Sequence, residues 1–128
     1  MVQHMGPVGA GTTTKIARNL ITFASYAVVG AAQRLAEAAG LDLGKLGDVV
    51  RHSDRVTGGP GAIMVRPTAQ VMAPDDGLRP IFEHSAVLGR KDLELAVEMG
   101  EELGVDLPLA RLAATKLRVA LGLDAPDA

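Results

Sequence analysis

The feature that most constrains this chain is a stretch of about 27 residues without proline, from Thr13 to Ala39. Apolar residues recur along it at intervals of three and four, namely Ile16, Leu20, Phe23, Ala27, Ala31 and Leu35. This spacing predicts one long helix, ended by Gly40. Val28, Val29 and Ala32 widen its apolar face almost all the way round, so we expect a central, buried helix.

The remaining helices are predicted from caps and spacing. We expect them at about 43–51, 82–103 and 108–121. Asp42 is placed to cap the first, Gly104 ends the second, and Pro108 opens the third. Between them we expect a loop at 52–61, a helical turn at 68–72 and a tight turn at 74–77.

The composition supports an all-helical fold. Hydrophobic residues make up 48% of the 128 residues but aromatics only 2%, so Ala, Val, Leu, Ile and Met must build the core. No hairpin signal or strand–helix alternation occurs. We therefore predict an all-α bundle around one long N-terminal helix. Residues 1–11 form a glycine-rich lead-in, 12–123 the helical domain and 124–128 a tail.

Several classes of function are disfavoured. The net charge is −2 and the basic residues are scattered, which argues against nucleic-acid binding. The longest apolar run, residues 20–32, is too short to cross a membrane. There is no cysteine, which agrees with a reducing compartment, and we expect a cytoplasmic protein. His4, His52 and His84 show no metal-ligand spacing.

The glycines Gly6, Gly9 and Gly11 precede a lysine, Lys15. Their spacing differs from the dinucleotide-binding fingerprint, no strand precedes them, and Lys15 comes too late for a phosphate-binding P-loop. What remains is a lead-in that places Lys15 in the first turn of the long helix, with Asn19 on the same face. An ordinary surface lysine is one interpretation. An acid–base group held beside the buried stretch is the other.

Three segments carry a resemblance to a known family: residues 6–19, 89–96 and 102–109. Together they resemble the β-hydroxyacid dehydrogenases, which include 3-hydroxyisobutyrate dehydrogenase, tartronate semialdehyde reductase and 6-phosphogluconate dehydrogenase. The first resembles the catalytic glycine–lysine–asparagine segment, the second a lysine–aspartate–leucine segment, and the third a closing Gly-Val-x-x-Pro-Leu. The match runs from about residue 5 to 121 and implies the C-terminal helical domain of such an enzyme.

The resemblance implies roles for particular residues. Lys15 would be the catalytic acid/base at the substrate hydroxyl or carbonyl, and Lys91 would contact the cofactor, NAD or NADP. Substrate would be bound by Asn19, Gly11, Thr12 and Asp92. It further implies a homodimer acting on a small 3-hydroxy acid. Without the resemblance, Lys91 and Asp92 are an ordinary solvated pair.

Two departures from the family pattern matter. Arg18 stands where the first of two asparagines is usual, and its guanidinium could bind a second acid group or simply face solvent. His84 occupies a position that is often aromatic.

The family's Rossmann domain, which holds most of the cofactor, has no counterpart in these 128 residues. We therefore expect the chain alone to be inactive. Three alternatives stay open: the chain acts with a separate Rossmann-domain partner, it is a catalytically silent dimerisation module, or it is a fragment of a full enzyme.

Overall fold

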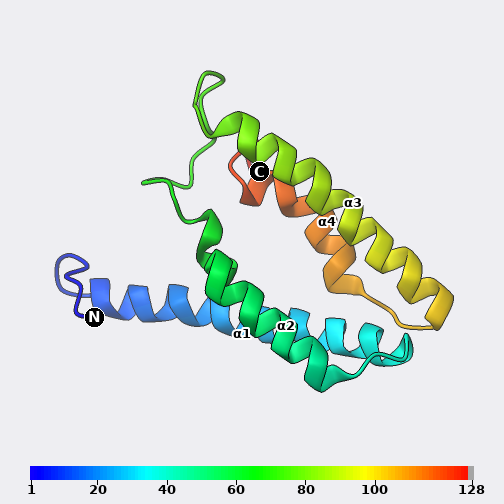
Figure 1. Cartoon of the computed structure of the whole chain (residues 1–128). Helices are drawn as coiled ribbons and strands as arrows, with labels where there is room; N and C mark the ends of the chain where they lie inside the picture. The colour runs from blue at the N-terminus through cyan, green and yellow to red at the C-terminus, as the bar shows by residue number, and fades with distance from the viewer. Residues whose placement is uncertain (127–128) are drawn as a thin grey trace.

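A computed structural model describes residues 1–126, and all its regular structure is helical (Figure 1). The elements are α1 (Ala10–Ala38), α2 (Leu43–Thr57), the 3-10 helix η1 (Gly59–Ile63), α3 (Arg79–Leu103) and α4 (Pro108–Ala120). Within this described part no strand occurs. The predicted all-α class is confirmed. The last two residues of the predicted tail lie outside the described residues.

Helix α1 begins earlier than predicted. It starts at Ala10, directly after Gly9, whose φ of 95° turns the chain into the helix. Two threonines near its start donate back into the helix: Thr13 Oγ1 donates to the Gly9 carbonyl (3.3 Å) and Thr14 Oγ1 to that of Ala10 (2.7 Å). Lys15 therefore lies in the second turn rather than the first.

The expectation that α1 is buried is wrong for this chain. Only Ala31 and Ala36, in its second half, are buried. In the first half Ile16, Leu20 and Phe23 keep 65%, 69% and 62% of their surface exposed. Figure 1 shows the reason, because the first turns of α1 extend beyond the other helices. An apolar helix is buried only where another element lies on it, and this chain supplies too few elements to surround α1.

Helix α2 is capped as predicted but runs further. The Asp42 carboxylate accepts a hydrogen bond from the Lys45 backbone N–H at 2.9 Å. The helix continues to Thr57, so the first part of the predicted 52–61 loop is wrong. Ser53 and Asp54 suggested a loop, but polar residues are tolerated on an exposed helix. The helix stops only at Gly58, whose φ of 90° belongs to the left-handed region.

The segment 64–78 contains no regular helix, so the helical turn predicted at 68–72 is wrong. Pro67 lies in this segment and disfavours a regular helix through it. The segment is held instead by the C-terminal end, because the Met72 N–H donates to the Gly122 carbonyl at 2.8 Å. The turn predicted at 74–77 is confirmed by a hydrogen bond from Asp76 N–H to the Ala73 carbonyl.

Helices α3 and α4 form an antiparallel pair that carries the core (Figure 1). Helix α3 begins at Arg79, three residues before the predicted start, with Pro80 in its first turn. Gly104, at φ 73°, ends it as predicted. The core consists of apolar side chains from α3, the 64–78 segment and the C-terminal end: Met72, Phe82, Ala86, Leu121 and Leu123.

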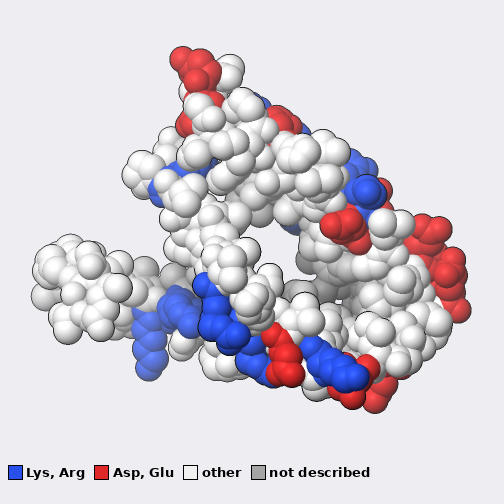
Figure 2. All heavy atoms as spheres, in the orientation of Figure 1, with Lys and Arg blue, Asp and Glu red and all other residues white. Residues whose placement is uncertain are grey.

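The molecule as a whole is open. Its accessible surface is 9551 Å² for 13.2 kDa. A compact monomer of this mass would expose roughly 6,400 Å², so about 3,100 Å² more is in contact with solvent. Figure 2 shows the consequence as open space between the α1–α2 layer and the α3–α4 pair. The fold is thus a bundle with one side uncovered.

Candidate functional site

The candidate catalytic pair, Lys15 and Asn19, lies on α1 one turn apart. Lys15 is exposed and Asn19 is half-buried. Within residues 1–126, Lys15 makes neither a hydrogen bond nor an ion pair, so its ammonium group is available to a ligand. The expectation that Lys15 is held beside a buried stretch is not met in this chain. A desolvated lysine would need a cover that another polypeptide provides.

Gly11 and Thr12 lie in the first turn of the same helix, and both are exposed. Thr12 is three residues from Lys15, which places the two side chains on neighbouring positions of the helix surface. The first three turns of α1 therefore carry four of the predicted site residues. Their roles remain predictions.

Lys91 and Asp92 lie apart from this group, in the middle of α3, where both are exposed. Figure 1 shows the first turns of α1 at the opposite side of the molecule from α3. The predicted substrate and cofactor residues are therefore not brought together within this chain. A ligand that contacts both groups would need to be held by further protein.

The first half of α1 has an uncompensated positive charge. Lys15 and Arg18 are the only charged residues between Ala10 and Gln33. Figure 2 shows basic side chains gathered over α1 and α2, whereas acidic ones are most frequent along α3. Such a surface attracts anionic ligands. Residues 1–126 contain no cluster of His, Cys, Asp or Glu that could hold a metal ion.

No helix in the described part of the chain has both the length and the apolar character needed to span a membrane.

A groove lies between α1 and the η1 region, beside Arg18. Sequence reasoning noted Arg18 but did not find this groove. From α1 it is lined by Arg18, Ile21, Thr22, Ser25 and Tyr26, and from the other side by Gly58, Pro60, Gly61 and Met64. The sequence did contain one indication of this groove: residues 18, 22 and 25 are three and four apart, and residues at such intervals share a helix face.

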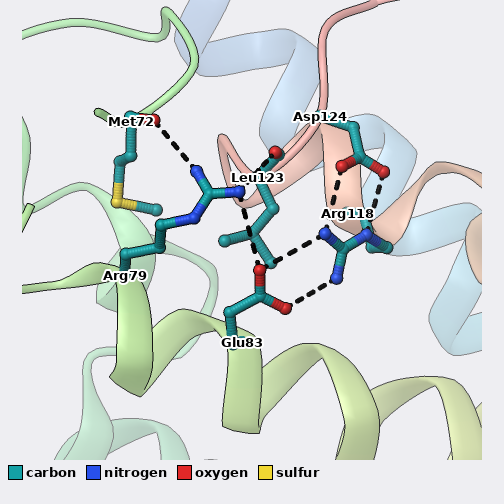
Figure 3. Close-up of polar contacts among 6 residues, drawn as sticks. All are labelled: Met72, Arg79, Glu83, Arg118, Leu123 and Asp124. Carbon is teal, nitrogen blue, oxygen red and sulfur yellow. Dashed lines mark hydrogen bonds and ion pairs between the residues drawn. The ribbon is translucent and has the colours of Figure 1, made fainter. Parts of the chain in front are cut away.

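A charged network at the other end of the molecule was missed from the sequence (Figure 3). Arg118 donates to both oxygens of Glu83 (2.7 and 3.3 Å) and of Asp124 (2.9 and 3.0 Å). Arg79 donates to the carbonyls of Met72 and Leu123. Hydrogen bonds from Arg118 lower the pKa of Glu83 and of Asp124 below their ordinary values. Its charges are mutually satisfied, so this network is structural.

The comparisons with known proteins decide the family. A family model described as "NAD-binding of NADP-dependent 3-hydroxyisobutyrate dehydrogenase" matches residues 9–127. This chain belongs to that dehydrogenase family. The segments 89–96 and 102–109 fall inside the matched residues, as does the first segment from Gly9 onward. The family is one of NAD-binding dehydrogenases, and its helical domain is the fold described above.

The chain is similar to uncharacterized oxidoreductases of two strains of Mycobacterium tuberculosis, CDC 1551 and H37Rv. Each is 59% identical over 124 residues, which cover 97% of this chain and 42% of the relative. It also resembles a crystal structure described as an oxidoreductase of Mycobacterium avium 104, with a TM-score of 0.93 and 56% identity over 96% of this chain and 44% of that one. The chain thus spans less than half the length of these relatives.

Proposed function

We propose that this chain is the substrate-binding and catalytic helical domain of an NAD(P)-dependent 3-hydroxyacid dehydrogenase. Lys15 acts as the acid/base at the substrate hydroxyl, and Asn19 positions the substrate or the lysine. Lys91 contacts the cofactor, and Gly11, Thr12 and Asp92 contact the substrate. The observation that carries the proposal is the unpartnered Lys15–Asn19 pair on the exposed first half of α1, inside the matched region.

The chemistry follows from what each group does. Oxidation of a hydroxy acid removes a hydride from carbon and a proton from the hydroxyl, and the nicotinamide cofactor accepts the hydride. Lys15 would take the proton in this direction and return it in the other. Lys91 and Asp92 lie on α3, whereas Lys15 lies near the start of α1, and we infer that the complete site needs the nucleotide-binding part of a full-length enzyme. The 128 residues alone are therefore expected to be inactive.

A chimera tests this proposal. The chain replaces the matching segment of the M. tuberculosis oxidoreductase, to which it is 59% identical. We expect oxidation of 3-hydroxy acids with NAD or NADP by the chimera and none by the isolated chain. Lys15→Ala should lower kcat by about 100-fold or more, the usual contribution of a general acid or base. Lys45→Ala, on exposed α2, is the control. Full activity of the Lys15→Ala chimera would contradict the proposal.

A second function is favoured by a separate observation, the uncovered surface. Ile16, Leu20 and Phe23 are all more than 60% exposed and lie on one side of α1. A surface of this kind is covered in stable assemblies. The alternative is that the chain serves as a catalytically silent dimerisation module. Its test is the oligomeric state, and the dimer itself is compatible with the catalytic proposal.

A further inference from the structure

We propose that the groove beside Arg18 binds a second acid group of the substrate, so that the preferred substrates are 3-hydroxy acids with two acid groups. This inference rests on the proposed function, in which Lys15 is engaged at the hydroxyl. Arg18 follows Lys15 by three residues on α1 and lines the groove between α1 and η1. One ligand can therefore contact both side chains.

Arg18 is free to bind a ligand. Within residues 1–126 its guanidinium, like those of Arg34 and Arg55, has no ion pair or hydrogen bond, whereas Arg51, Arg79, Arg90, Arg111 and Arg118 pair with acids. The planar guanidinium presents parallel N–H groups that match a carboxylate or phosphate. Asp54 lines an adjoining groove, but its carboxylate makes no ion pair with Arg18. The cation therefore lacks an anion in the structure.

The other residues of the groove suit an acid group. Ser25 and Tyr26 line it, and their hydroxyls have no partner within the described part of the chain, so each can donate to an oxyanion. Thr22 cannot do so, because its Oγ1 already donates to the Arg18 carbonyl at 3.2 Å. Ile21, Pro60 and Met64 supply apolar walls beside these hydroxyls. Charge-assisted hydrogen bonds are strengthened in such surroundings.

A binding experiment on the 128-residue chain tests this groove directly. The probes are 3-hydroxyglutarate and its monomethyl ester, which are nearly equal in size but differ by one negative charge. Binding is followed by amide chemical shifts of the ¹⁵N-labelled protein. We expect 3-hydroxyglutarate to bind about tenfold more tightly, a difference of about 1.4 kcal/mol, with shifts centred on residues 18–26 and 58–64.

Three variants sharpen the test. Arg18→Asn should abolish the preference for 3-hydroxyglutarate, and Arg18→Lys should retain part of it because the charge remains. Arg34→Gln, which removes a cation from the other end of α1, should leave the preference unchanged. Both positions, 18 and 34, are exposed, so we expect the fold to be preserved. Equal binding of the two probes, no binding of either, or a preference that survives Arg18→Asn would overturn the inference.

The chimera separates this inference from the proposed function. Suppose that turnover depends on Lys15, but that kcat/KM shows no Arg18-dependent preference for 3-hydroxyglutarate over its ester. This result would refute the acid-group site in the groove and leave the proposed catalysis standing. A binding preference that depends on Arg18, together with turnover that is indifferent to Lys15→Ala, would refute the proposed catalysis and leave the acid-group site standing.

Discussion

At the scale of single residues, Arg118 is the charged side chain whose removal should cost most. It joins α4 to Glu83 of α3 and to Asp124 beyond α4, and its side chain is 40% exposed. We expect Arg118→Gln to lower the thermal unfolding midpoint by a few degrees, measured by circular dichroism. Arg90→Gln is the control, because the Arg90–Glu94 pair lies within one helix and is 65% and 57% exposed. Equal effects of the two substitutions would mean that the network adds nothing specific.

The same network predicts a dependence on pH. The pKa of Glu83 lies below its ordinary 4.5 and that of Asp124 below its ordinary 3.8, mainly because Arg118 donates hydrogen bonds to both carboxylates. A carboxylate with a lowered pKa in the folded state stabilises the fold above its unfolded-state pKa. That stability is lost as the pH falls through the folded-state pKa. The difference in unfolding midpoint between wild type and Arg118→Gln should therefore be full at pH 7 and shrink below about pH 4. A difference that stays constant down to pH 3 would contradict this origin.

Residue spacing and the family resemblance together were enough to select Lys15, Asn19 and Arg18 from the sequence. Spacing put Lys15 and Asn19 on one helix face, and the resemblance gave them their roles and marked Arg18 as a departure. They were not enough to find the Arg118 network. Glu83 and Arg118 are 35 residues apart, on two helices, and their meeting depends on how α3 packs on α4. The exposure of Lys15 could not be predicted either, since it depends on which element lies over it.

At the scale of elements, Gly100 allows the last turn of α3 to pack closely against the turn that follows the helix. A Cβ there would lie 2.5 Å from the Val105 carbonyl and 3.0 Å from Leu107 Cδ1. We expect Gly100→Ala to destabilise the fold by roughly 1–3 kcal/mol, because backbone must move. Gly30→Ala in α1, where the nearest atom is 3.7 Å away on the flexible Arg34, should stabilise it by up to about 1 kcal/mol through helix propensity. Chemical denaturation measures both, and a neutral Gly100→Ala would refute the close approach.

The boundaries of the helices show which local signals are reliable. Asp42 and Gly104 were placed correctly because a capping carboxylate and a left-handed glycine act on their immediate neighbours. The end of α2 was misjudged because Ser53 and Asp54 are neutral on an exposed helix, and only Gly58 forces the chain out of it. A residue therefore ends a helix reliably when it controls the backbone geometry, as a capping aspartate or a left-handed glycine does. Polar residues such as Ser53 and Asp54 do not end a helix by themselves.

At the scale of the whole molecule, the apolar perimeter of α1 was read correctly from the sequence, but its burial was not. Ile16, Leu20 and Phe23 recur at intervals of four and three on the side of α1 away from the Arg18 groove. Covering them requires a surface that these 128 residues do not provide. The excess of about 3,100 Å² on one chain is at least as large as the roughly 1,000–2,500 Å² that each partner buries in an obligate interface. We therefore expect a second copy to pack on this side.

Sedimentation velocity should show a dimer of the 128-residue chain at micromolar concentration. Leu20→Gln with Phe23→Gln should weaken it by at least about 100-fold, because burying each side chain contributes about 1.5–3 kcal/mol and both copies carry both substitutions. Val49→Gln with Val56→Gln is the matched control: these valines are 64% and 74% exposed on α2, and glutamine preserves the helix. If the α2 variant dissociates and the α1 variant does not, the copies meet on α2 instead. A wild-type chain that sediments as a monomer would refute the second copy altogether and leave the apolar side of α1 to the nucleotide-binding part of a full-length enzyme.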